Sequence, residues 1–309
     1  MKNRESLGLL IVVFCGMIWG LGGVMGQILF HHSDMTPAML SSVRMFVAGL
    51  ILTVYCLMRR GISSLRILHS GRDTGYFICF AMTGIMAMQF SYFAAVKASN
   101  AATATVLQYI YPVLILICTV ISQKKKPKLY EVIAVLSTFA GVFVVATHCN
   151  LAQLHMSPAS VFWGMVAAVS YVVYTIAPGR LYKEYGLTEI VGLGMFIGGI
   201  VLSFLTGCYK TTVTVTPLVV GITLFITLFS SLIPMVLYGK GVAILGNMRA
   251  SLYVTVEPVF CTLVSIMLGL TKLVWMDIFG FLLILVPIEY IAYEGRKQDE
   301  KKRPGDNGN

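Results

Sequence analysis

The 309-residue chain is 57% hydrophobic and only 12% charged, and its formal net charge is +10 at pH 7. Soluble domains carry about a quarter charged residues, so this composition excludes an ordinary soluble protein and indicates an integral membrane protein. The excess of Lys and Arg does not indicate a nucleic-acid-binding protein, because most basic residues fall in short breaks between long apolar stretches.

Ten charge-poor stretches follow one another along the chain. Each has roughly 17–25 residues, enough for an α-helix to cross a bilayer core about 30 Å thick. The stretches are continuously apolar and do not alternate apolar with polar residues, which excludes the strands of a membrane β-barrel. The predicted spans lie near 7–30, 37–58, 76–95, 101–121, 129–147, 158–177, 188–208, 217–238, 250–270 and 273–293.

The distribution of basic residues predicts the orientation of these spans. With the N-terminus in the cytoplasm, 19 of the 23 Lys and Arg residues fall on the cytoplasmic side. Lys97, Lys210 and Lys272 fall on the other side, and Arg44 lies within the second span. Cytoplasmic loops are enriched in Lys and Arg. The sequence therefore predicts a multi-pass protein of the cell (plasma or inner) membrane with both termini, including a tail at 294–309, in the cytoplasm.

The chain contains an internal repeat with an offset of 146 residues. Under this offset, 95–121 aligns with 241–267, and Pro112 falls on Pro258. Each half then holds five spans, and because five is odd the second half enters the membrane in the opposite orientation. Such inverted repeats are typical of secondary transporters, whose solute sites lie near the membrane midplane between the repeats. The predicted fold class is an all-α integral membrane protein with ten transmembrane helices in two inverted five-helix repeats, 8–147 and 158–293.

Several short motifs, in this order and spacing, resemble a known family. They are "MIWG" in the first span, "TPAMLSSVRMFVAGLIL" in the second and "YVTVEPVF" in the ninth. Together with the ten spans they resemble the EamA branch of the drug/metabolite transporter superfamily. The resemblance implies an exporter or facilitator of small solutes, with a central cavity lined mainly by spans 1, 3, 4, 6, 8 and 9. The motif "TPAMLSSVRM" further resembles members grouped as carboxylate, amino-acid and amine transporters.

Glu257 is the ionisable residue that this pattern singles out. It lies about seven residues, or about 10 Å, inside the ninth span, and Pro258 follows it directly. Ionisable groups at such depth mark solute or ion pathways; the alternative is a structural carboxyl bonded to a neighbouring helix. Tyr111 precedes Pro112 at the equivalent place and supplies a neutral hydroxyl. We expect the two prolines to be flexing points of spans 4 and 9.

Other polar and aromatic side chains lie at depth on the spans expected to line the cavity. Aromatic walls with a few convergent polar groups are typical of small-molecule pockets, although each residue alone could serve helix packing. Trp19, at mid-span, either stacks on a solute or fills the core. The candidate solute-binding residues are Trp19, Gln89, Tyr92, Gln108, Tyr111, Tyr171, Tyr174, Tyr238, Tyr253 and Glu257.

Arg44 has a gating or structural role in this prediction, together with Pro112 and Pro258. It lies about seven residues from the outer end of the second span, so its head group could reach the surface. Its expected depth differs from that of Glu257 by about 10 Å, which argues against a direct ion pair. The sequence does not decide whether Arg44 faces the cavity.

No motif predicts a metal or cofactor. The seven cysteines are scattered singly, without a Cys-x-x-Cys pair, and nothing in the sequence brings the histidines together. Gly192, Gly194 and Gly198 lie inside a span, so they do not form a nucleotide-binding loop. We therefore expect no metal and no cofactor.

The predicted function is that of a secondary transporter, not an enzyme. It exports small polar metabolites such as amino acids or amines by alternating access, with protons as a candidate coupling partner. An uncoupled facilitator or a channel is the alternative; a membrane-embedded enzyme would need a nucleophile–base pair at depth, and the histidines lie in loops. The expected partners are a small solute, the lipid bilayer and protons, and not nucleic acid. The solute, the coupling ion, the direction and the oligomeric state are left open.

Overall fold

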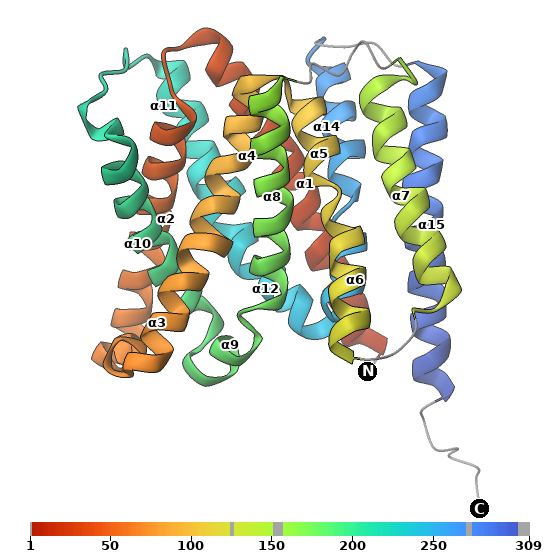
Figure 1. Cartoon of the computed structure of the whole chain (residues 1–309), viewed down its shortest axis with the longest axis horizontal. Helices are drawn as coiled ribbons and strands as arrows, with labels where there is room; N and C mark the ends of the chain where they lie inside the picture. Colours follow the sequence, from red (N-terminus) through yellow and green to blue (C-terminus); the bar gives the residue numbers. More distant parts are fainter. Residues whose placement is uncertain (1, 124–126, 151–156, 270–273, 302–309) are drawn as a thin grey trace, which may run out of the picture.

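The computed structural model of the chain describes residues 2–123, 127–150, 157–269 and 274–301. Within these ranges the regular structure is helical, without strands, and the long helices run side by side across the molecule (Figure 1). In this described part, nine helices are long and apolar enough to cross a membrane, and Trp275–Ile288 is a shorter apolar helix. The prediction of an all-α membrane protein with ten helices is confirmed.

The spans follow the predicted order. Four of them extend at least five residues beyond the predicted limits: the first begins at Lys2, the third begins at Gly71, the eighth continues to Leu245 and the tenth continues to Lys301. Short helical segments connect spans at the face where the N-terminus lies: η1 (Gly61–His69) and α9 (Gly179–Tyr185). The spans are α1 (Lys2–His32), α2 (Pro37–Arg60), α3 (Gly71–Phe80) with η2 (Ala81–Met86) and α4 (Ala87–Ala98), α5 (Ala101–Gln108) with α6 (Tyr111–Gln123), α7 (Leu129–Thr147), α8 (Pro158–Ile176), α10 (Leu187–Thr206), α11 (Pro217–Phe225) with η5 (Ile226–Leu232) and α12 (Ile233–Leu245), α13 (Asn247–Tyr253) with α14 (Val256–Met267), and α15 (Trp275–Lys301).

A hydroxyl residue followed by proline begins three of the spans. Thr36, Ser157 and Thr216 each accept a hydrogen bond from the main-chain N–H three residues on, and a proline occupies the first helical position. The side-chain oxygen satisfies an N–H that the helix leaves free, and the fixed φ of proline suits the first turn. These caps lie at the upper face of the molecule in Figure 1, where α2, α8 and α11 begin.

The two halves of the chain are inverted relative to each other. The first span, α1, starts at the lower face beside the N-terminus, whereas α8, the first span of the second half, starts at the upper face (Figure 1). The offset of 146 residues recurs in the backbone. Shifted by 146, the π-helical segment Ala81–Met86 falls on 227–232, inside the π-helical segment Ile226–Leu232. Equivalent irregularities in equivalent spans support the two repeats, for which we propose the boundaries 8–147 and 158–293.

Spans 4 and 9 are each broken into two helices directly before a proline. The break between α5 and α6 precedes Pro112, and the break between α13 and α14 precedes Pro258. Proline has no N–H to offer the carbonyl four residues earlier, so neither helix continues through this point without loss. Discontinuous helices in corresponding positions of two repeats are a feature of secondary transporters.

Contacts between the halves hold the bundle together. α1 packs on α12 and α14, α2 packs on α10, α4 packs on α8, and α7 packs on α15. The α2–α10 contact is close because Gly49, Gly192 and Gly199 lie in it, and a Cβ at any of them would meet the partner helix. Small residues at such positions let membrane helices approach closely.

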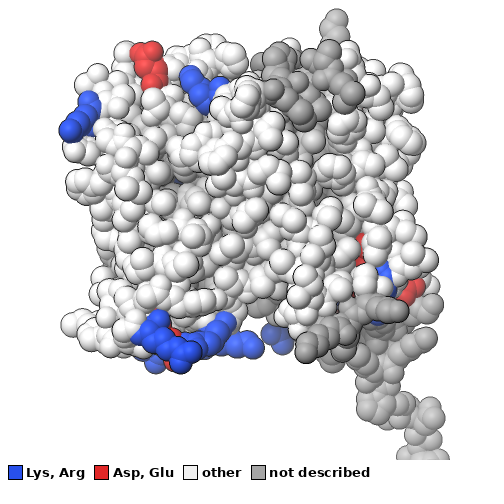
Figure 2. Space-filling view, viewed as in Figure 1, with Lys and Arg blue, Asp and Glu red and all other residues white. Residues whose placement is uncertain are grey.

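Three ion pairs join the two halves at the lower face, where Lys and Arg side chains gather in Figure 2. Each pair takes one partner from the first half and one from the second. A single solvent-exposed ion pair contributes little to stability. Together the three pairs link the two repeats at the face that the predicted orientation assigns to the cytoplasm. The pairs are Glu5 with Arg249, Arg60 with Glu189 at 2.8 Å, and Asp73 with Arg180.

Candidate functional site

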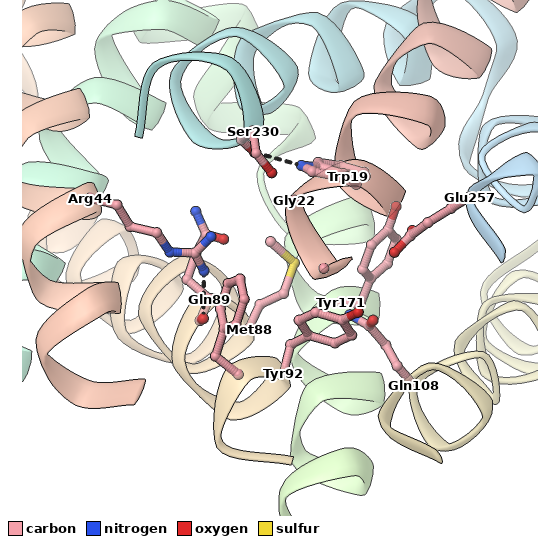
Figure 3. A pocket seen from close by; sticks show the side chains of 12 residues that line it. Trp19, Gly22, Arg44, Met88, Gln89, Tyr92, Gln108, Tyr171, Ser230 and Glu257 are labelled. Atoms are coloured by element: carbon pink, nitrogen blue, oxygen red, sulfur yellow. Dashed lines mark hydrogen bonds between the residues drawn. The ribbon is translucent and has the colours of Figure 1, made fainter. Parts of the chain in front are cut away.

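A small cavity of about 50 Å³ lies between the two halves of the bundle (Figure 3). Its wall contains residues of spans 1, 3, 4, 6, 8 and 9, which are the spans that the family resemblance implied. Span 2 contributes as well, through Arg44. The lining residues are Trp19, Gly22, Gly23, Arg44, Met88, Gln89, Tyr92, Phe93, Gln108, Tyr171, Ser230 and Glu257.

Six of the ten predicted solute-binding residues lie in this wall. The structure places the other four, Tyr111, Tyr174, Tyr238 and Tyr253, behind the wall, where all four are buried. Spacing along a helix could place these tyrosines at depth, but it could not tell which helix face would turn to the cavity and which to a neighbouring helix. The six in the wall are Trp19, Gln89, Tyr92, Gln108, Tyr171 and Glu257.

Three of the tyrosines behind the wall pack against Tyr171, Tyr111 face to face and the other two edge-on. We call this cluster the tyrosine block: Tyr111, Tyr171, Tyr174 and Tyr238. The ring centroids of Tyr111 and Tyr171 are 4.0 Å apart, and those of Tyr174 and Tyr238 are 6.0 Å apart. The Tyr174 hydroxyl donates to the carbonyl of Met235 at 2.7 Å. Because α8 and α12 both run toward the lower face (Figure 1), Tyr174 and Tyr238 lie between the cavity and that face.

Glu257 lies in the first turn of α14 and is only 8% exposed. Its Oε2 accepts a hydrogen bond from the hydroxyl of Tyr109 at 3.0 Å, and the same hydroxyl lies 3.4 Å from the carbonyl of Val254. Pro258 cannot bond to that carbonyl, because it has no N–H. No ion pair in the described part of the chain includes Glu257. The carboxyl group therefore faces the cavity with a neutral partner.

Tyr109 is a partner that sequence reasoning missed. The repeat offset aligns Glu257 with Tyr111, so the sequence predicted that Tyr111 supplies the neutral hydroxyl at the equivalent place. In the structure, Tyr111 instead donates to the carbonyl of Ser251 at 3.2 Å. Tyr109 lies in the break between α5 and α6, at the position that the repeat offset aligns with Thr255 in the break between α13 and α14. Its position next to a broken helix was the one available signal.

Arg44 is 3% exposed and lies at the end of the cavity opposite Glu257 (Figure 3). Its guanidinium donates to the main-chain carbonyl of Gln89 at 2.6 Å and to the hydroxyl of Ser231 at 3.4 Å. The guanidinium carbon lies 4.5 Å from the ring centroid of Phe93, a cation–π contact. Arg44 thus faces the cavity instead of reaching the membrane surface, and its described partners are neutral.

The wall at Trp19 depends on a proline in span 8. The indole N–H of Trp19 donates to the carbonyl of Ser230 at 3.0 Å (Figure 3). In a regular α-helix this carbonyl would bond to the N–H of residue 234, but Pro234 has none. The side chain of Trp19 satisfies the freed carbonyl and is held in the cavity wall by it. Ser230 itself was not predicted, because a serine inside an apolar span has no distinctive pattern.

Glycines on α1 allow the broken part of span 9 to approach. A Cβ at Gly20 would lie 2.7 Å from the carbonyl oxygen of Glu257, and one at Gly16 would lie 2.6 Å from that of Val254. Neither oxygen can move without moving the backbone that carries Glu257. These two glycines therefore set the position of the carboxyl group.

We expect Gly20→Ala to lower the thermal unfolding midpoint of the purified protein and to reduce transport. Overpacking a buried contact costs about 1–3 kcal/mol, which exceeds the roughly 1 kcal/mol that alanine contributes in a helix relative to glycine. Gly221→Ala is the matched control, because a Cβ there meets nothing within 4 Å. It should leave the midpoint unchanged or slightly higher. An equal response of both variants would contradict the close contact at Gly20.

Comparison with known proteins agrees with this architecture. The EamA-like transporter family matches residues 6–147 and 158–291. The chain is 30% identical over 291 residues to the "Uncharacterized inner membrane transporter YicL" of Salmonella typhimurium, covering 94% of this chain and 97% of that protein. It is 23% identical over 312 residues to the "Uncharacterized transporter YrdR" of Bacillus subtilis, covering 97% and 96% respectively.

A solved crystal structure shares the fold, with a TM-score of 0.76 at 17% sequence identity, covering 95% of this chain and 99% of the other. The chain belongs to the EamA-like transporter family. It is therefore a multi-pass membrane protein of a transporter class, as the motifs in spans 1, 2 and 9 implied.

Proposed function

We propose that the protein is a secondary transporter that exports small polar metabolites such as amino acids or amines by alternating access, in exchange for protons. The observation that carries this proposal is the carboxyl group of Glu257 in the wall of a buried cavity, bonded to a tyrosine hydroxyl and without a basic partner in the described residues. An apolar environment disfavours a charged carboxylate unless a cation lies beside it. Either a proton on the Glu257 carboxyl group or an ammonium group beside it removes this cost, and the carboxyl group cannot bind both at once.

The arrangement of the halves supports alternating access. The lower-face ion pairs and the tyrosine block lie between the cavity and the face of the N-terminus, so we take this state to be closed toward that face. Opening toward it requires those contacts to separate, and the broken spans 4 and 9 are the elements best suited to bend. The inverted repeats provide the second state, in which the opposite face closes.

Export requires that the N-terminal face be cytoplasmic, as the charge distribution predicts. We expect Thr212→Cys, on the upper face, to react with a membrane-impermeant maleimide on intact cells, and Ser63→Cys, in η1, to react only after permeabilisation. Both side chains are exposed, and the variants are made on a cysteine-free background. Labelling of Ser63→Cys on intact cells would invert the proposed orientation.

Purified protein in liposomes tests the function directly. An outward or inward pH gradient should drive labelled amino acid or amine against its gradient, and unlabelled solute on the other side should accelerate exchange. A channel does not show such counter-flow, and an uncoupled facilitator shows counter-flow without a response to pH. Solute movement that saturates, counter-flows and ignores the pH gradient would therefore contradict proton exchange but retain the transporter.

A further inference from the structure

Arg44 forms a positively charged end of the cavity, opposite the carboxyl group of Glu257. Arg44 is a buried cation whose described hydrogen-bond partners, the Gln89 carbonyl and the Ser231 hydroxyl, are both uncharged. No ion pair in the described residues includes it. Removing such a charge from water without a counter-charge is strongly unfavourable. If Arg44 had only a structural role, we would expect an acidic side chain beside it. If it binds an anionic ligand during transport, the position beside the guanidinium has to be free when the ligand is absent.

Two buried donors at this end lack partners in the described structure. They are the Nε of Arg44 and the Nε2 of Gln89, in side chains that are 3% and 6% exposed. Buried polar groups are nearly always hydrogen-bonded, so an unpartnered pair in a cavity wall points to a missing acceptor. A carboxylate offers two acceptor oxygens and the negative counter-charge that the Arg44 guanidinium lacks. Arg binds carboxylates with two parallel hydrogen bonds.

The two charged ends do not neutralise each other. Figure 3 shows Arg44 and Glu257 on opposite sides, with Trp19, Met88 and Tyr171 between them. A solute that satisfies both ends must carry an anionic and a cationic group on a short skeleton. The cavity, about 50 Å³, is smaller than the roughly 300–1,000 Å³ that small-molecule sites occupy, so its walls must separate to admit such a solute.

We propose that the cavity recognises a zwitterion, with Arg44 and Gln89 binding the carboxylate and Glu257 binding the ammonium group. Arg44 is then the residue that separates amino acids from simple amines. This inference rests on the proposed function, because it assumes that Glu257 meets the cationic group of the solute. It narrows that function to solutes carrying both charges, with an apolar side chain against the aromatic wall.

Ligand-induced thermal stabilisation of the purified full-length protein tests the inference without requiring transport, because a ligand that binds the native state raises its stability. The probes are three matched sets that share a side chain. Each set has an amino acid, the amine without its carboxylate and the acid without its ammonium group: alanine, ethylamine and propionate; leucine, isoamylamine and 4-methylpentanoate; phenylalanine, phenethylamine and 3-phenylpropionate.

For the wild type, we expect at least one amino acid to bind at least tenfold more tightly than its amine and its acid. Arg44→Gln should weaken binding of that amino acid at least tenfold and leave the amine within about twofold, which removes the preference. Arg44→Lys should retain part of it, because lysine keeps the charge but not the paired hydrogen bonds. Arg59→Gln, at the surface, is the charge-matched control and should bind like the wild type.

Gln89→Met provides a second test if Arg44→Gln does not fold. It removes the side-chain donor and leaves the main-chain carbonyl that holds Arg44, so the preference for the amino acid should fall severalfold. An unchanged preference in Arg44→Gln would overturn the assignment, as would an unchanged preference in both Arg44→Lys and Gln89→Met. A wild type that binds amines as tightly as amino acids contradicts the zwitterion and leaves the proposed function standing. A wild type that binds none of the nine compounds contradicts both.

Discussion

Exchange driven by a pH gradient should fall to the rate of protein-free liposomes when Glu257 is replaced by glutamine. Glutamine keeps the size of the side chain, and its amide oxygen can still accept the hydrogen bond from Tyr109 that the carboxyl group accepts at 3.0 Å. What it lacks is the ability to release a proton and to carry a negative charge. The protein should therefore fold and insert normally while losing the group on which proton and solute compete.

The same role of Glu257 predicts that solute binding weakens as the pH falls. Protonation removes the charge that attracts the ammonium group, so acid conditions should weaken binding of a cationic or zwitterionic solute. Below the pH at which the carboxyl group titrates in the cavity, the apparent affinity should fall about tenfold per pH unit. In Glu257→Gln this dependence should disappear, leaving weak binding that does not change with pH.

The measurement is uptake into liposomes under an imposed pH gradient, with thermal unfolding of each variant as the check on folding. Asp34→Asn is the matched control, since Asp34 is an exposed acid outside the cavity. It should exchange like the wild type. Wild-type exchange by Glu257→Gln, with the same pH profile, would make the carboxyl group structural and assign the proton coupling to another group.

Pro258→Ala should slow turnover roughly tenfold, equivalent to about 1.4 kcal/mol in the barrier, with little change in solute binding. The alanine N–H can bond to the carbonyl of Val254, which now accepts from the Glu257 N–H at 3.0 Å and lies near the Tyr109 hydroxyl. Proline is about 3 kcal/mol less favourable than alanine in a helix. Its replacement therefore favours a continuous, stiffer span 9 and opposes the bend that alternating access requires.

Single-turnover and steady-state exchange, compared with ligand-induced stabilisation, separate this effect from a loss of affinity. Pro287→Ala is the control, because Pro287 lies inside α15, away from the cavity. Removing it should leave turnover close to that of the wild type. If Pro258→Ala expressed normally and turned over at the wild-type rate, the break in span 9 would have no part in the transport cycle.

Composition and local sequence pattern were sufficient to predict the ten spans and their inverted repeat. The ten apolar stretches predicted the spans because crossing a bilayer depends on length and hydropathy, which are properties of each segment by itself. The repeat offset of 146 anticipated the paired breaks before Pro112 and Pro258, since the loss of an N–H at proline is also local. It equally relates the two π-helical segments, which no motif indicated but which fall in equivalent spans.

Tertiary structure alone decided which side chains meet in the cavity. Tyr174 and Tyr171 are three residues apart on α8, yet only Tyr171 lines the cavity, because the neighbouring helices determine which part of each face is covered. Arg44 joined the site because the close glycine contact between α2 and α10 and the carbonyl of Gln89 hold it there. Tyr109 reached Glu257 because both helices break, and a broken helix no longer follows the register that sequence spacing predicts.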